Sequence, residues 1–290
     1  MTNQNKAGLL ALLTVLFWGS AATAFKLTLK HIDIISIIFI ASGASFLIFL
    51  IAGISGNKFK NITFRELGKS AILGFLNPFI YYLILLKAYS LLPAQQAQPL
   101  NFIWPILIVL LSIPLLHHKL KLFDAVALLI SFLGVLIIST KGNFSLMKIN
   151  SPLGVILATS SSLLWALYFV LNVRDKRDDI RKLALNFFFG FLFSSILFFA
   201  SGHSLPTQIK GVWGALYIGS LEMGITFLIW IKALKLCPNS SFLNNIIYLT
   251  PFVALIFVRL FLQESIHYSA VLGLTIITSG IFFQKMSQKK

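Results

Sequence analysis

The sequence predicts an all-α polytopic membrane protein with ten transmembrane helices, arranged as two inverted five-helix repeats around a central cavity. Three observations lead to this prediction. The composition is 58% hydrophobic and only 11% charged, whereas a soluble domain carries about 25% charged residues. Apolar runs of about 20 residues, the length that crosses a bilayer, recur along the whole chain. One of these runs has a close match in the second half.

We expect ten membrane spans, which leave no room for a separate soluble domain. They cover residues 7–29, 34–54, 69–91, 94–116, 122–140, 152–172, 183–201, 211–235, 239–263 and 267–286. Residues 1–148 and 149–290 are each expected to form one five-helix repeat. Residues 22–24 resemble a signal-peptide cleavage site, but the apolar run before them is long, so we interpret it as an uncleaved first helix.

The repeat is clearest between residues 74–93 and 219–238, which match at a constant offset of 145 with nine identities in 20 positions. In that alignment Asn77 lies opposite Glu222. Because five is an odd number, the second set of helices enters the membrane in the opposite orientation. Secondary transporters are often built this way, with the binding site near the midplane and interrupted helices at matching positions pointing to it.

The net charge of +16 is explained by topology rather than by a nucleic-acid partner. Most lysines and arginines lie at ends of spans that are cytoplasmic if the N-terminus is cytoplasmic. The positive-inside rule therefore places both termini in the cytoplasm. Cys237 is the only cysteine, so no intrachain disulfide is possible. His117 and His118 cannot both face one ligand position on a helix, and we expect neither a metal nor another cofactor.

Polar and aromatic side chains inside the spans are candidates for lining the cavity. Asn77 and Pro78 lie near the midpoint of the third span, with Tyr81 one helical turn beyond Asn77. Pro78 removes a backbone hydrogen bond, which is tolerated only beside protein or a water-filled cavity. The span 183–201 is rich in phenylalanine, and we expect it to be a lipid-facing scaffold.

The fourth span begins with Gln95, Gln98 and Asn101, spaced by three and therefore on one flank of a helix. These amides either hydrogen-bond between helices or line a substrate- or water-filled face. The full set of candidate cavity residues is Glu222, Asn77, Tyr81, Gln95, Gln98, Asn101, Trp104, Trp18, Trp165, Tyr168, Thr226, Asn244, Asn245 and Tyr248, and the candidate helix breaks are Pro78, Pro105 and Pro251.

Four motifs carry a resemblance to a known family: FWGSAATAFK at 17–26, the paired KA-x-x-L-x-P ends of the third and eighth spans, NFIWP at 101–105, and YLTP at 248–251 with LFLQES after it. With these the chain resembles the drug/metabolite transporter superfamily, in particular its ten-helix EamA-type exporters and permeases. NFIWP is similar to the NYLWP-type stretch of the aromatic amino-acid exporters.

The resemblance implies a monomer in the bacterial inner membrane that moves amino acids or other small metabolites by alternating access. It also implies that helices 1, 3, 4, 6, 8 and 9 line the cavity. The family's glutamate at the end of helix 9 corresponds to Glu264, but its first-half counterpart here is His118. Glu222 is not a general family residue, so the resemblance assigns it no role.

Three roles therefore stay open for Glu222, which lies in an apolar run where a charge normally faces a cavity or a partner. It could exchange a proton during transport, bind an ammonium group of the substrate, or be a structural hydrogen-bond partner of Asn77, Tyr248 or a lysine. We predict a secondary active transporter, an exporter of amino acids or similar small metabolites, with protons as the candidate coupling ion.

The alternatives are a passive channel and a non-transporting membrane scaffold. A membrane-embedded enzyme is disfavoured, because such enzymes need a nucleophile–base pair or a His/Asp cluster. The chain has only eight acidic residues, and no histidine shares a mid-membrane region with Glu222. The expected partners are a small-molecule substrate, the lipid bilayer and protons.

Overall fold

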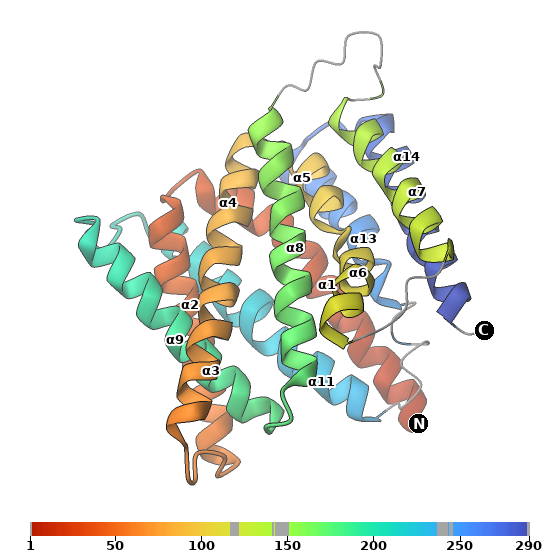
Figure 1. Ribbon diagram of the computed structural model, residues 1–290. Helices are drawn as coiled ribbons and strands as arrows, with labels where there is room; N and C mark the ends of the chain where they lie inside the picture. Colours follow the sequence, from red (N-terminus) through yellow and green to blue (C-terminus); the bar gives the residue numbers. More distant parts are fainter. Residues whose placement is uncertain are drawn as a thin grey trace. The chain divides into compact units, whose positions relative to one another are not determined.

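The computed structural model describes residues 2–116, 122–140, 142, 151–236, 243 and 246–288 (Figure 1). In this part of the chain every regular element is a helix. The elements are α1 (Asn3–Leu29), α2 (Ile34–Ser55), α3 (Phe64–Gly74), η1 (Phe75–Ile80), α4 (Tyr81–Leu91), α5 (Ala94–Asn101), α6 (Trp104–Leu116), α7 (Leu122–Ser139), α8 (Pro152–Arg174), α9 (Asp179–Ala200), α10 (Ile209–Tyr217), η2 (Ile218–Ile225), α11 (Thr226–Leu236), α13 (Thr250–Phe257), η3 (Val258–Leu262) and α14 (Tyr268–Gln288). The η elements are segments with wider, π-helical turns.

Six helices among the described residues are long and apolar enough to cross a membrane. They are α1, α2, Phe64–Leu91, α8, α9 and Ile209–Leu236, and shorter apolar helices cover Leu129–Ile138, Thr250–Leu262 and Tyr268–Phe283. The prediction of an all-helical polytopic membrane protein is thereby confirmed. The number of ten spans and their inverted arrangement stay predictions.

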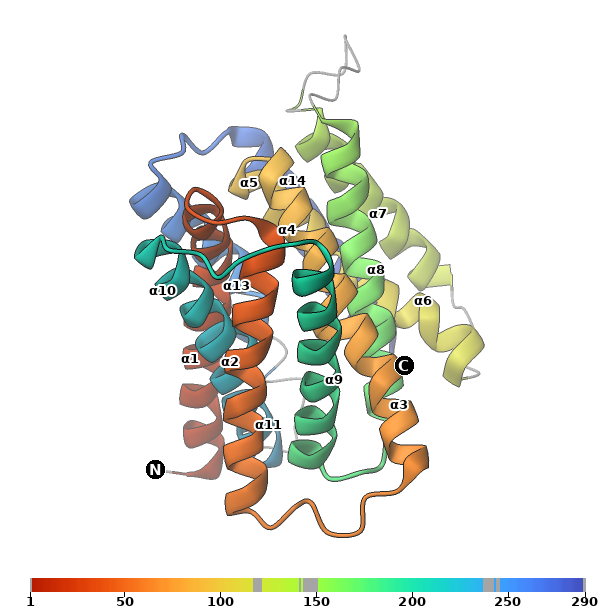
Figure 2. The same cartoon turned by 90° about the vertical axis from the view of Figure 1, so that its left-hand side faces the viewer.

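The chain forms two compact units, and neither is a continuous half of the sequence. Unit 1 contains Met1–Leu83 and Lys176–Phe257, and unit 2 contains Ile84–Asp175 and Val258–Lys290. In unit 1, α1 packs on α11 and α13, while α2 packs on α9 and η2. Figure 2 shows α2 and α9 side by side. In unit 2, α7 packs on α14, and α8 packs on α5 and α6 (Figure 1).

The interface between α2 and α9 corrects one expectation. Phe39 stacks on Phe198 with ring centroids 4.4 Å apart, and Phe49 packs on Phe187 at 4.8 Å. Phe187 and Phe198 are fully buried, although other α9 side chains such as Phe199 are exposed. The expectation of a purely lipid-facing span 183–201 is therefore wrong, because α9 buries one face against α2.

That buried face of α9 is also polar. Asn186 and Ser194 are both buried, two turns apart, with Gly190 between them. The hydroxyls of Ser194 and Ser42 of α2 lie 2.7 Å apart. Gly190 lets the ring of Pro78 approach the α9 backbone so closely that a Cβ at residue 190 would overlap it. The buried side of α9 thus combines phenylalanines with a row of small and polar residues.

Several predicted spans are interrupted. The third span begins earlier than predicted, at Phe64, and is broken in η1, where Asn77 has extended backbone angles (φ −149°, ψ 122°). The fourth is split into α5 and α6 after Asn101, because Pro105 has no N–H to donate to the carbonyl of Asn101, four residues back, and its ring would clash with that carbonyl in a continuous helix. Pro105 and Pro251 each occupy the second residue of their helix, where the missing N–H is not needed.

Candidate functional site

Glu222 lies in η2, the wide-turn segment within the long span Ile209–Leu236. It is 8% exposed. A π-helical turn leaves carbonyls out of their usual register, and one of them is satisfied locally: the hydroxyl of Thr226 donates to the carbonyl oxygen of Leu221 at 2.5 Å. Single wide turns of this kind occur frequently at functional sites. The candidate Thr226 therefore stabilises the turn that carries Glu222.

The carboxylate of Glu222 is held by a residue that sequence reasoning did not select. The hydroxyl of Tyr82 donates to Oε1 at 2.9 Å and to Oε2 at 2.7 Å. Tyr82 is 1% exposed, and its ring packs edge-on against Phe25 of α1 at 6.3 Å. Among the described residues, no lysine or arginine forms an ion pair with Glu222. The hydrogen-bond partner of the carboxylate is thus Tyr82, which is none of the expected partners, Asn77, Tyr248 or a lysine.

Trp18 of α1 contacts the same turn from another side. Its Nε1 donates to the backbone carbonyl oxygen of Glu222 at 3.2 Å. Its ring meets Phe227 at 5.6 Å and Trp230 at 6.2 Å. Trp18 therefore fixes the position of η2 relative to α1 and joins an aromatic cluster next to the carboxylate. The sequence placed it in the cavity wall, and the structure places it beside Glu222.

Asn77 does not hydrogen-bond Glu222, so the prediction that Asn77 is the structural partner of Glu222 is wrong. Asn77 is fully buried, and both its amide oxygen and its amide nitrogen lack a hydrogen-bond partner among the described residues. Tyr81, predicted to lie one turn beyond Asn77, is buried and packs edge-on against Tyr82 at 4.7 Å. A buried unpaired amide is costly, and the placement of Asn77 in the cavity wall stays a prediction.

Asn186 of α9 shares these properties and was missed. It is fully buried, and neither amide atom has a hydrogen-bond partner in the described part of the chain. The turn of α9 that carries Asn186 packs closely against η1 and the end of α3. The contact is so close that a Cβ added at Gly74 would overlap the backbone carbonyl oxygen of Asn186. The signal that could have found it is the spacing of Asn186, Gly190 and Ser194, four residues apart on one helix face.

The candidates in unit 2 are largely satisfied by protein groups. Gln95 donates from Nε2 to the carbonyl oxygen of Ser265 at 2.9 Å, and its Oε1 accepts from the N–H of His267 at 2.7 Å. Gln98 accepts from the hydroxyl of Tyr89 at 2.5 Å. For these two glutamines the contacts match the alternative in which amides hydrogen-bond between segments of the protein.

The other unit 2 candidates lie on α5, α6 and α8. Asn101 donates to the hydroxyl of Ser161 at 2.9 Å. Trp165 packs on Tyr168 with centroids 5.9 Å apart, and Trp104 lies 6.2 Å from Phe169. Their role in lining a cavity stays a prediction.

Glu264, the residue that corresponds to the family glutamate, has a clear local task in unit 2. Its carboxylate accepts from the N–H of Ala94 at 3.2 Å and from that of Gln95 at 3.5 Å. The first N–H groups of a helix lack intrahelical partners, and Pro93 provides no side-chain cap. Glu264 therefore caps α5.

Two ninth-span candidates, Asn244 and Asn245, lie outside the described residues. Tyr248 is 9% exposed. Within the described part of the chain, no group of three or more histidine, cysteine, aspartate or glutamate side chains could hold a metal ion.

Comparisons with known proteins bear on the whole chain. The sequence profile of the EamA-like transporter family matches residues 5–140 and again residues 152–284. A Clostridium kluyveri protein described as an uncharacterized transporter is 24% identical over 299 residues, covering 98% of this chain and 94% of the relative. The uncharacterized transporter YoaV of Bacillus subtilis is 24% identical over 281 residues, covering 92% of each.

The fold also has a solved counterpart. A crystal structure, described simply as that of a protein, aligns over 97% of both chains with a TM-score of 0.68 and 17% identity. At that identity the likeness concerns the fold alone. The profile match confirms the family resemblance that the sequence motifs indicated.

Proposed function

Because the chain belongs to the EamA-like transporter family, we propose that it is a secondary active transporter that exports amino acids or similar small metabolites by alternating access, with Glu222 as its proton-coupling group. One observation carries the proposal. A carboxylate inside a membrane span is buried, and its described partner is a tyrosine hydroxyl rather than a cation. Ionisable residues in such positions mark ion and substrate pathways and proton relays.

The chemistry of this pair suits a group that gains and loses a proton. A hydroxyl can donate to an ionised carboxylate and can also accept from a protonated one. Tyr82 can therefore remain a hydrogen-bond partner of Glu222 in both states. A fixed ion pair with a lysine would instead hold Glu222 in one charge state.

For the architecture, we propose ten spans in two inverted repeats, residues 1–148 and 149–290. The double profile match at residues 5–140 and 152–284 supports this division. So do the η segments, because η1 (Phe75–Ile80) and the end of η2 interrupt the matching helices at equivalent positions in the alignment with an offset of 145 residues. Interrupted helices at corresponding positions in two repeats are typical of transporter binding sites.

We place the protein, as a monomer, in the bacterial inner membrane, with both termini in the cytoplasm. The distribution of lysine and arginine supports this orientation. The loop between α2 and α3 and the one between α8 and α9 carry two basic residues each, and both loops lie on the cytoplasmic side in this topology.

A second role for Glu222 deserves a direct comparison, because the Trp18 ring lies beside its turn. Aromatic faces attract ammonium groups, and the carboxylate could pair with the amino group of a substrate. Analogues without the amino group separate the two roles. They would lose transport if Glu222 binds ammonium, and would keep it if Glu222 carries only protons.

The test begins with a metabolite comparison of cells with and without the gene, inside and outside, which identifies the exported compound. The purified protein in liposomes is then assayed with and without an imposed pH gradient. We expect Glu222→Gln to abolish the stimulation by the gradient. Asp33→Asn, which removes a carboxylate just outside α2, should retain it. Unchanged transport and pH dependence in Glu222→Gln would end the proton-coupling proposal.

A further inference from the structure

Two buried amides lie where η1 meets α9, within unit 1. Asn77 of η1 and Asn186 of α9 are both fully buried, and none of their side-chain oxygen and nitrogen atoms forms a hydrogen bond in the described part of the chain. Buried polar groups in proteins are almost always hydrogen-bonded, and one without a partner costs free energy. The packing of η1 on α9 therefore carries such a cost at each amide.

The two segments approach closely because each has a glycine at the contact. A Cβ added at Gly74, next to η1, would overlap the backbone carbonyl oxygen of Asn186, and a Cβ added at Gly190 would overlap the ring of Pro78. Asn77 lies between Gly74 and Pro78, so both amides belong to this one close contact. Their oxygen and nitrogen atoms are closed off from solvent.

Only apolar contacts join η1 to α9 among the described residues. The rings of Phe75 and Phe79 lie 5.7 and 5.9 Å from that of Phe193. In the same part of the chain, no hydrogen bond or ion pair connects residues 75–80 to α9. Separating η1 from α9 therefore breaks ring contacts and van der Waals packing but no polar interaction.

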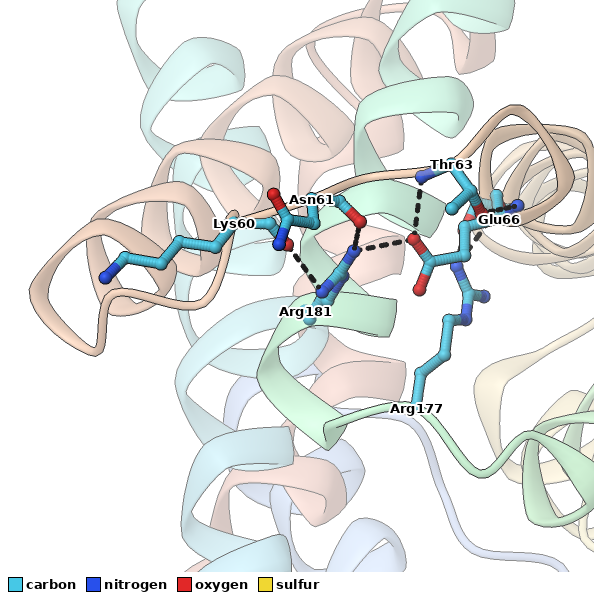
Figure 3. A network of polar contacts seen from close by, with 7 residues as sticks. Lys60, Asn61, Thr63, Glu66, Arg177 and Arg181 are labelled. Atoms are coloured by element: carbon cyan, nitrogen blue, oxygen red, sulfur yellow. Dashed lines mark hydrogen bonds and ion pairs between the residues drawn. The ribbon is translucent and has the colours of Figure 1, made fainter.

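The start of α9 is held far more firmly to the segment before η1. Arg181 donates to the carbonyl oxygens of Lys60 and Asn61 at 3.0 and 2.9 Å, and to the carboxylate of Glu66 at 2.6 Å (Figure 3). Arg177 donates to the backbone carbonyl oxygen of Glu66 at 3.1 Å. Hydrogen bonds to charged groups are the stronger ones, so this network anchors the start of α3 on α9.

The helix break in η1 provides a point at which the chain can bend. Asn77 has extended backbone angles (φ −149°, ψ 122°), and a few residues at such an element boundary can absorb the change in direction of a moving segment. On the other side, α9 stays attached to α2, because the hydroxyls of Ser194 and Ser42 lie 2.7 Å apart. The η1 segment can thus move away from α9 while α2 and the start of α3 stay in place.

We propose that the contact between η1 and α9 has a second, open state in which water enters and hydrogen-bonds the amides of Asn77 and Asn186. An amide both donates and accepts hydrogen bonds, and water provides both, whereas a metal cation would leave the two NH₂ groups unpaired. Hydration of the amides favours the open state, and packing of the phenylalanine rings favours the closed one. The inference rests on the proposed function for its place in alternating access, which needs a contact that opens to water.

The test measures the reaction of single cysteines with a water-soluble methanethiosulfonate reagent, in membranes that contain the full chain with Cys237, the only cysteine, replaced by serine. A thiol reacts as the thiolate, so its labelling rate reports access of water. We expect Asn186→Cys to be labelled at least tenfold faster than Ser194→Cys. Ser194 is the matched control, because it is equally buried on the same helix but belongs to the contact with α2.

Asn77→Leu gives a second readout. It replaces the remaining amide by an apolar group that gains nothing from water, so it should slow the labelling of Asn186→Cys several-fold. Ser42→Ala, which removes a buried hydroxyl of the α2 contact, should not slow it. Equal labelling of residues 186 and 194 would overturn the proposal, and so would unchanged or faster labelling in Asn77→Leu.

The comparison of residues 186 and 194 decides the question even if Asn77→Leu does not fold. Labelling detects the open state without any transport assay. A chain that transports nothing can therefore still show the open state, and a transporter can lack it, so the two proposals can fail separately.

Discussion

The hydroxyl of Tyr82 donates to both carboxylate oxygens of Glu222, at 2.9 and 2.7 Å. The two residues are 140 positions apart in sequence and come from the two helices that match in the repeat alignment. Whatever changes the charge of Glu222 therefore acts directly on the third span through this tyrosine. The pair is the first place to test how the two helices are coupled.

Tyr82→Phe removes the hydrogen bond and keeps the ring. Because the buried carboxyl group then loses its described partner, we expect the free energy of unfolding to fall by about 1–3 kcal/mol and the pH profile of transport to move. Tyr217→Phe is the matched control, since its hydroxyl bonds to that of Ser20 at 2.7 Å, a group that does not titrate. A pH profile moved equally by both variants would contradict a special role for Tyr82.

Asn186→Leu replaces a buried amide that has no described partner by an apolar group of similar volume. Since burying an unpaired amide costs about 1–3 kcal/mol in proteins, we expect thermal stability in detergent to increase. Ser194→Ala, two turns further along α9, should instead decrease it by about 1 kcal/mol, because Ser194 bonds Ser42. A lower melting temperature of Asn186→Leu would show that the amide is satisfied.

Alanine substitutions at two glycines of α3 should change the stability of the protein in opposite directions. At Gly74 a Cβ would overlap the carbonyl oxygen of Asn186, which is rigid backbone, so Gly74→Ala should destabilise by about 1–3 kcal/mol. At Gly68 the Cβ enters open space, and helix propensity should stabilise by about 0.5–1 kcal/mol. Melting temperatures of the two variants, measured side by side, check the close packing of α3 on α9.

The carboxylate of Asp178 should make the stability of the protein depend on pH in the acid range. Burial alone would raise its pKa, but the hydrogen bonds from Lys58 and from the N–H groups of Arg181 and Ile180 outweigh it and hold the pKa below 3.8. Because the folded-state pKa is below the unfolded one, the contribution to stability is present above about pH 4 and is lost as the pH falls through the folded pKa.

Asp178→Asn should therefore lose less stability than the unmodified protein between pH 5 and 3, about 1 kcal/mol or less, because Asp178 is a third exposed. Melting curves over this range provide the measurement. Lys58→Gln removes the other member of the ion pair, and it should likewise make stability fall less steeply between pH 5 and 3. Identical slopes in all three proteins would show that the ion pair contributes nothing.

The sequence sufficed for the features that depend on composition and on single costly residues. Hydropathy predicted an all-helical membrane protein, four short motifs indicated the family, and one carboxylate in an apolar run led to Glu222. Tyr82 could not be selected in this way, because a tyrosine among apolar residues is ordinary in a membrane helix. Its pairing also depends on the packing of helices far apart in sequence, which no local pattern encodes.

The choice of Tyr81 over Tyr82 has a more specific cause. Tyr81 follows Asn77 by four residues, one turn of an α-helix. In η1, however, the N–H of Tyr81 bonds to the carbonyl of Leu76, five residues back. Because Asn77 also has extended backbone angles within η1, α-helical spacing does not continue across this break, and face assignments based on that spacing no longer hold beyond it. The helix breaks themselves were predictable from proline, but their turn width was not.

The wide turn of η2 has a consequence for how the length of this chain can change in evolution. A segment closed by hydrogen bonds across five residues contains one residue more than the α-helix on either side needs. Losing a single residue between 218 and 225 would convert the turn to ordinary α-helix and leave α10 and α11 on the same axis and faces. Related chains can therefore differ in length by one residue at this turn, and by doing so they would remove or reposition the carboxylate without rebuilding the helix around it.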